Sequence, residues 1–167
     1  IYAAISESHK HEKGPWPVIT KKVGSLIDNC DRPKILDLAT GPGQPALTLA
    51  QTYPNAHVNA TDLSDDFISK VKAQVGTLGL TNVEPSVVDL QDLDKFSDNQ
   101  FDIVSCCYGY MFAEDKVKAL SETFRVLKPG GSLIATTWDE RDSLRICDEI
   151  MTAVLKEKPP PSTLNTM

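Results

Sequence analysis

The segment from Lys34 to Gly43 restricts the possible folds more than any other part of the chain. An apolar run over residues 34–39 is typical of a buried strand, a glycine loop follows, and residues 45–51 then have the composition of a helix. Glycine has no Cβ, so backbone N–H groups at the start of the helix can approach a ligand closely. Asp37 stands beside this loop, where a carboxylate repels phosphate and attracts an ammonium group. The segment therefore predicts a site for a cationic small molecule.

Strand-like and helix-like segments alternate through the rest of the chain. Further strands are predicted at residues 57–62, 83–88, 101–107 and 132–138. Helices are predicted at residues 17–29, 64–78, 114–127 and 143–155. This alternation favours right-handed βαβ units, and so an α/β fold: a doubly wound, mostly parallel sheet with helices on both faces.

Length and composition narrow the class of protein. The 167 residues fit one domain, which we place at residues 16–156, between an N-terminal tail or lid (1–15) and a proline-rich tail (157–167). The net charge of −6 argues against nucleic acid or an anionic membrane surface as the main partner, and no apolar stretch is long enough to span a membrane. The four cysteines have no metal-ligand spacing and indicate a reducing, cytoplasmic setting. We expect no metal.

Acidic residues recur where the predicted strands end. Asp62 ends the second strand, 21 residues after Gly41, which is the spacing expected of an acid that binds ribose hydroxyls. Asp89 follows the third strand and is suited to accept from an adenine amino group. Each acid alone also fits a structural role, as a buried acid, a helix-entry residue or a turn former. Their order at successive strand ends favours a nucleoside-binding site, because ligands of such sheets bind at the carboxyl ends of the strands.

Four stretches of the sequence together resemble a known family. They are residues 35–43 (ILDLATGPG), 60–64 (ATDLS), 96–104 (FSDNQFDIV) and 124–131 (FRVLKPGG). The chain resembles the class I S-adenosylmethionine-dependent methyltransferases, specifically the methyltransferase type 11 branch that includes ubiquinone/menaquinone methyltransferases. The resemblance implies a Rossmann-like fold. The sequence departs from the family's pattern in two places. It has Ala39 where the family often has glycine, and the C-terminal strands of the family's sheet are apparently missing.

The resemblance also implies roles for individual residues. Asp37 would act on the methionine ammonium group through water or the loop backbone, and Asp62 would bind the ribose. Asp89 would accept from adenine, beside the Leu90 N–H. The remaining expected cofactor contacts are Ala39, Thr40, Gly41 and Gly43 along the methionine, Leu63 on the adenine and the Cys107 backbone near the sulfonium. Tyr108, Tyr110 and Trp138 are expected to line the acceptor pocket, and no catalytic base is assigned.

The function expected from these residues is transfer of a methyl group from S-adenosylmethionine to a small-molecule acceptor. In-line displacement at a sulfonium depends mainly on positioning, so the absence of a nucleophile–base motif from the sequence is compatible with it. One alternative is a methyltransferase-like domain that binds without catalysis. The other is a nicotinamide-dependent oxidoreductase, since Gly41, Gly43 and Ala46 match the dinucleotide fingerprint, but Asp37 would repel pyrophosphate.

Overall fold

The computed structural model describes residues 14–137. Several predictions fall outside these residues: the N-terminal tail or lid, the helix at 143–155, Trp138, the proline-rich tail and the lack of later strands.

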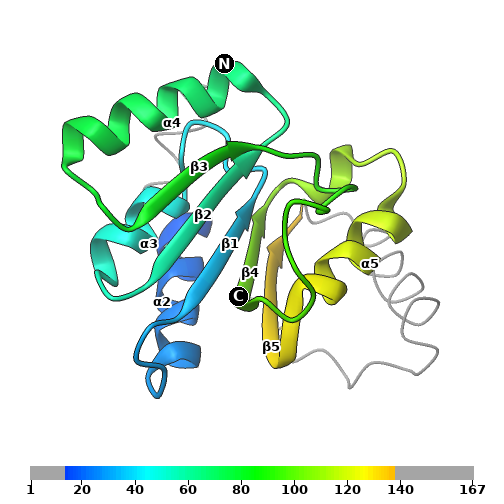
Figure 1. The fold of residues 1–167 in the computed structure, drawn as a ribbon, viewed down its shortest axis with the longest axis horizontal. Helices are drawn as coiled ribbons and strands as arrows, with labels where there is room; N and C mark the ends of the chain where they lie inside the picture. The colour runs from blue at the N-terminus through cyan, green and yellow to red at the C-terminus, as the bar shows by residue number, and fades with distance from the viewer. Residues whose placement is uncertain (1–13, 138–167) are drawn as a thin grey trace.

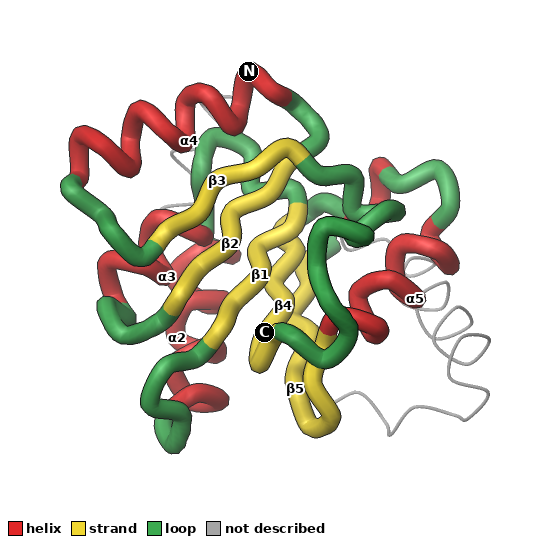
Figure 2. The backbone as a smooth tube through the Cα atoms, in the orientation of Figure 1, coloured by secondary structure: helices red, strands yellow, loops and turns green. Residues whose placement is uncertain are grey.

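A five-stranded parallel sheet forms the centre of the described chain (Figures 1 and 2). Its strands, in chain order, are β1 (Lys34–Leu38), β2 (His57–Asp62), β3 (Val83–Val87), β4 (Phe101–Cys107) and β5 (Leu127–Thr136). The spatial order is β3-β2-β1-β4-β5, so the direction of winding reverses between β1 and β4. This confirms the predicted doubly wound α/β fold and places the ligand-binding position at the carboxyl end of β1.

Helices cover both faces of the sheet, as the alternation predicted. They are α2 (Pro15–Ile27), α3 (Ala46–Thr52), α4 (Asp65–Leu78) and α5 (Lys116–Val126), with a short 3-10 helix, η1 (Tyr110–Phe112). α2, α3 and α4 pack on one face and α5 on the other (Figure 1). Within residues 14–137, no helix is both long enough and apolar enough to traverse a lipid bilayer.

The two faces of the sheet carry separate hydrophobic clusters. Along β1, Ile35 joins the cluster under α2, α3 and α4, whereas Leu36 and Leu38 join the one on the α5 side. This alternation follows from the two-residue period of a strand. Both faces of β1 are therefore buried, which explains why its sequence is a nearly continuous apolar run.

The ends of α4 agree with the sequence prediction. The Ser64 side chain accepts the N–H of Phe67 (3.3 Å) as the N-cap, and Gly79 ends the helix with φ +64°. α5 starts two residues later than predicted, because the Asp115 carboxylate accepts the N–H of Lys118 (2.8 Å) and so makes Asp115 the N-cap.

The fifth strand starts earlier than predicted and stops short of residue 138. Leu127 already pairs with Phe101, and the register then shifts before Ile103 pairs with Ser132. Gly130, at φ +80°, adopts the left-handed backbone that lets the intervening residues leave the ladder and rejoin it. The Pro-Gly-Gly sequence therefore interrupts the strand's pairing and does not precede the strand.

Arg125 of α5 fixes the loop that follows β3. Its guanidinium donates to the backbone carbonyls of Phe96 (2.9 Å) and Leu93 (2.9 Å) and to the carboxylates of Asp98 (2.8 Å) and Glu122 (2.7 Å). The Glu122 carboxylate in turn accepts the Leu93 N–H (2.9 Å), and its bonds to Arg125 lower its pKa. The Arg125 side chain thus satisfies two backbone carbonyls of a loop without regular structure.

We expect Arg125→Met to lower the free energy of unfolding by about 2–3 kcal/mol, because it leaves two backbone carbonyls and the Glu122 carboxylate without their donor. Asp98→Ala removes only an exposed partner and should cost less than about 1 kcal/mol. Urea denaturation of both variants measures the difference. Equal costs would show that the backbone bonds contribute nothing beyond the surface ion pair.

Candidate functional site

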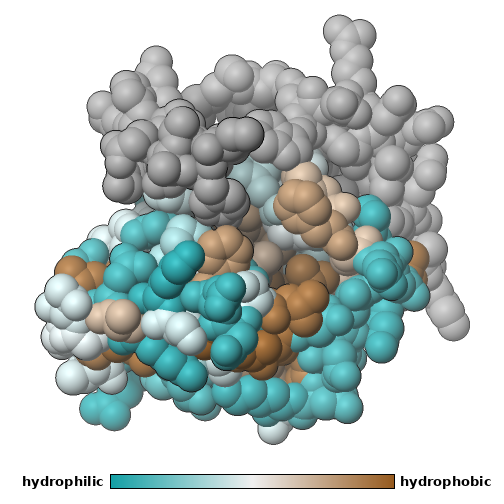
Figure 3. All heavy atoms as spheres, turned by 90° about the horizontal axis from the view of Figure 1, so that it is seen from above, coloured by the Kyte–Doolittle hydropathy of each residue, from teal (hydrophilic) through white to brown (hydrophobic). Residues whose placement is uncertain are grey.

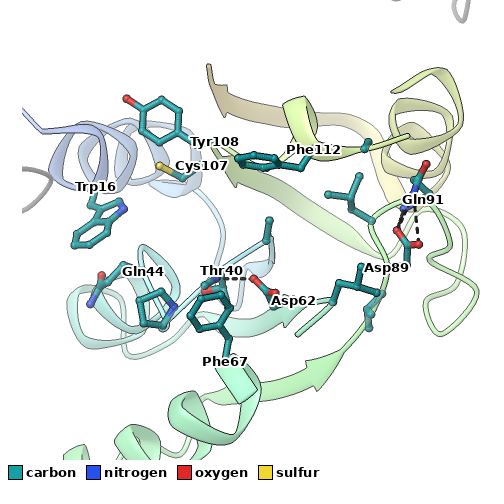
Figure 4. A pocket seen from close by; sticks show the side chains of 18 residues that line it. Trp16, Thr40, Gln44, Asp62, Phe67, Asp89, Gln91, Cys107, Tyr108 and Phe112 are labelled. Carbon is teal, nitrogen blue, oxygen red and sulfur yellow. Dashed lines mark hydrogen bonds between the residues drawn. The ribbon is translucent and has the colours of Figure 1, made fainter. Parts of the chain in front are cut away.

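A cavity of about 400 Å³ opens at the carboxyl ends of the strands, beside the point between β1 and β4 where the winding reverses (Figure 4). Figure 3 shows hydrophobic side chains gathered in the middle of the face seen from above in Figure 1, between hydrophilic regions. The volume of the cavity lies within the range of small-molecule and cofactor sites.

Most of the residues predicted for the site line this cavity. They are Ala39, Thr40, Gly41, Asp62, Leu63, Asp89, Leu90, Cys107 and Tyr108. They come from the ends of β1, β2, β3 and β4, which are far apart in sequence. Asp37, Gly43 and Tyr110 are described but lie outside the cavity wall, and Trp138 lies outside the described residues.

Asp62 organises the glycine loop. One carboxylate oxygen accepts the N–H of Gly41 (2.8 Å; Figure 4), and the other accepts the N–H of Ser64 (2.9 Å). The loop is held further by the Thr40 N–H, which donates to the Thr61 carbonyl (2.8 Å). The acid that was predicted to bind a ligand therefore also sets the shape of the loop opposite it.

Two glycines permit the close packing around the loop. A Cβ on Gly43 would lie 2.6 Å from Leu47 Cδ1, so Gly43 faces helix α3 and not the cavity. A Cβ on Gly109 would lie 2.6 Å from the Ala39 Cβ and 2.5 Å from Cys106 Sγ. The loops after β1 and β4 can therefore touch only because residue 109 has no side chain.

Asp37 lies beneath the loop, fully buried. Ser105 Oγ donates to one of its carboxylate oxygens (2.6 Å), and the Thr40 hydroxyl and the Ala46 N–H also lie close enough to the carboxylate to lower its pKa. Burial raises the Asp37 pKa to about 6, against the lowering effect of the Ser105 bond. Tyr110 is directed elsewhere because its hydroxyl bonds to Thr123 Oγ1 (2.7 Å) beside α5.

Several cavity residues were not found from the sequence. Trp16 comes from α2, Phe67 from the first turn of α4, Gln91 from the loop after β3 and Phe112 from η1 (Figure 4). Gln91 could have been predicted from the sequence, because it stands two residues after Asp89. The side chain of an aspartate commonly accepts the backbone N–H of the residue at that position. Trp16 and Phe112 could not have been predicted in this way, since only the tertiary packing brings them to this edge.

The charge of the cavity wall is negative. Asp62 and Asp89 line it, and no Lys, Arg or His is among the described lining residues. Burial raises the pKa of the Cys107 thiol to about 11, so that this lining group is a neutral thiol near pH 7. Such a wall favours a cationic or neutral ligand and disfavours a pyrophosphate.

We expect the buried Asp37 to make stability fall as pH rises. Its pKa is higher in the folded state (about 6) than in the unfolded chain, so between pH 4.5 and 7 the folded state binds more protons and loses stability relative to an untitratable variant. The free energy of unfolding of the wild type minus that of Asp37→Asn should fall by about 2 kcal/mol over this range. Urea denaturation at several pH values measures it, and a difference that does not change with pH would contradict the assignment.

The chain is similar to methyltransferases over most of its described length. Residues 35–131, more than half of the chain, match the family model described as a methyltransferase domain. Demethylmenaquinone methyltransferase from Thermus thermophilus is 38% identical over 103 residues, which are 60% of this chain and 45% of that protein.

Solved structures share the fold. A SAM-dependent methyltransferase from Aquifex aeolicus superposes with a TM-score of 0.67 at 24% identity, over 84% of this chain and 75% of that one. The [4+2]-cyclase SpnF superposes with a TM-score of 0.66 at 28% identity, over 72% of this chain and 44% of that one.

The chain spans about half the length of the curated relatives it matches. The matched residues nevertheless include every residue that lines the cavity except Trp16. The resemblance that the sequence motifs suggested is thereby confirmed: the chain belongs to the methyltransferase domain family.

Proposed function

We propose that this chain binds S-adenosylmethionine in the cavity and transfers its methyl group to a small apolar acceptor. The observation that carries the proposal is the joint position of Asp62 and Asp89 on the wall of one cavity, opposite the glycine loop. Family membership assigns S-adenosylmethionine as the cofactor. The similarity to demethylmenaquinone methyltransferase supports an acceptor of the quinone kind.

The described residues fit this cofactor. Each Asp62 oxygen accepts one backbone N–H and so keeps accepting capacity for a ribose hydroxyl. Leu63, whose side chain is 69% exposed, offers apolar surface beside it for an adenine ring. The Asp37 carboxylate lies buried beneath the glycine loop, where it adds an acidic group close to the place expected for the ligand's ammonium group without touching the ligand.

The protein's part in such a reaction is to position and desolvate. When bound, S-adenosylmethionine supplies an electrophilic methyl group on a sulfonium. The carboxylates of Asp62 and Asp89 hold the nucleoside end, while Trp16, Cys107 and Phe112 give the cavity apolar surface that excludes water from the acceptor. Because the Cys107 thiol is neutral, it does not compete as a thiolate nucleophile.

We also infer a reducing, cytoplasmic setting for the protein. Cys30, Cys106 and Cys107 are all free thiols, and Cys106 is fully buried. The negative wall of the cavity supports a small molecule as the partner, in preference to a nucleic acid.

Calorimetric titration of the chain with S-adenosylmethionine tests the proposal. We expect binding that weakens at least about 100-fold in Asp62→Ala, since both ribose contacts and the anchor of the loop are lost. Asp66→Ala is the matched control, because Asp66 is an exposed acid of the same helix entrance and does not line the cavity. NADH, titrated in parallel, should not bind.

The possible outcomes separate the alternatives. Tight NADH binding without binding of S-adenosylmethionine would contradict the proposal and favour an oxidoreductase. Cofactor binding that is followed by no methyl transfer to any of a panel of quinols would favour a domain that binds without catalysis. An equal loss of affinity in Asp62→Ala and Asp66→Ala would move the binding site away from this cavity.

A further inference from the structure

Gln91 connects two segments of the cavity edge. Its backbone N–H donates to Asp89 Oδ1 (2.8 Å), and its side-chain Nε2 lies 3.3 Å and 3.4 Å from the two Asp89 oxygens (Figure 4). At its other end, Gln91 Oε1 accepts the backbone N–H of Asp115 (2.6 Å), the N-cap of α5. The half-buried side chain therefore spans from the end of β3 to the start of α5.

These contacts allow only one orientation of the amide. The Asp115 N–H can only donate, so the atom that faces it must be the carbonyl oxygen. The NH₂ group must then face Asp89, where the carboxylate can only accept. A flipped amide would place an oxygen against a carboxylate and an NH₂ against an N–H, and both contacts would be repulsive.

The two Asp89 oxygens are used unequally. Oδ1 accepts the backbone N–H at 2.8 Å as well as the amide at 3.3 Å, whereas Oδ2 has only the long amide contact at 3.4 Å among the described residues. Oδ2 thus keeps the greater accepting capacity on a residue of the cavity wall. An oxygen held in this way accepts from a ligand donor and repels a ligand carbonyl.

We propose that Gln91 is a positioning residue that makes the cavity selective for a 6-amino purine over a 6-oxo purine, by holding the Asp89 carboxylate with Oδ2 available to the base. The inference rests on the proposed function, because it takes a nucleoside cofactor to be the ligand. Gln91 acts through Asp89 and need not touch the base itself.

The experiment compares two ligands whose bases differ in the group at C6, amino against oxo, and consequently at N1, which carries a hydrogen only in the oxo form. S-adenosylhomocysteine and S-inosylhomocysteine are titrated against the wild type, Gln91→Met, Gln91→Glu and Gln51→Met. The wild type should bind the adenine form at least tenfold more tightly, since a charged acceptor gains a donor from one ligand and faces a carbonyl in the other. Gln91→Met removes the side-chain contacts to Asp89 and to Asp115 and should reduce that ratio roughly tenfold.

Gln91→Glu keeps the oxygen for Asp115 but replaces the donating NH₂ with a second acceptor, so that it should lose selectivity to a similar extent while keeping the link to α5. Gln51→Met, an exposed change on α3, should leave both affinities and their ratio unchanged. Thermal unfolding checks that every variant is folded, and Gln91→Glu carries the test if Gln91→Met is not.

If Gln91→Met and Gln91→Glu lower the affinities for both ligands by the same factor, the ratio of the two affinities stays constant. That result would overturn the inference and leave Gln91 with a structural role only. Failure of the proposed function looks different, because the wild type would then bind neither ligand. If Gln91 is as proposed, Asp62→Ala should weaken both ligands equally, since the ribose is common to them.

Discussion

The carboxylate of Asp62 is the interaction on which the site depends. It joins three segments that come from different parts of the chain: the end of β2, the glycine loop after β1 through the Gly41 N–H, and the entry to α4 through the Ser64 N–H. The loop backbone is left-handed at Ala39 (φ +54°) and Gly41 (φ +55°), a conformation with an energetic cost outside glycine. A charged acceptor opposite the Gly41 N–H offsets part of that cost, so a site for a ligand and a support for the loop share one side chain.

The opposite side of the cavity is held by a second chain of polar contacts. Asp89 is linked through Gln91 to the N-cap of α5, and Arg125 near the end of α5 holds the loop that continues from Gln91. This loop contains no regular secondary structure between Leu90 and Gln100, so its backbone groups depend on side chains for their hydrogen bonds. Helix α5 therefore does more than cover one face of the sheet: it keeps the segment after β3 in place at the cavity edge.

The sequence predicted the elements whose signals are local. The limits of β2 and β4 were predicted to the residue, and those of α4 to within one residue. The positions of Asp62 and Asp89 at strand ends followed from the strands themselves. The early start of β5 was not predictable in this way, because it depends on the pairing of Leu127 with Phe101 across the sheet.

The sequence did not predict those site residues whose positions depend on side-chain direction or on long-range packing. Asp37 falls on the strand face shared with Ile35, and its carboxylate is consequently enclosed below the loop instead of on the cavity wall. Trp16 reaches the cavity because α2 packs against β4 and β5, an arrangement that no local pattern near residue 16 encodes. Glycine at 109 is required by contact with Ala39 and Cys106, which only the folded sheet brings near it.

The most direct measurement for the central claim is a crystal structure of this chain with S-adenosylhomocysteine. Our prediction is that both ribose hydroxyls lie within hydrogen-bond distance of the Asp62 carboxylate, with the Gly41 N–H still bound to it and the adenine amino group at Asp89 Oδ2. A nucleoside bound elsewhere, or bound here with its ribose turned away from Asp62, would contradict it.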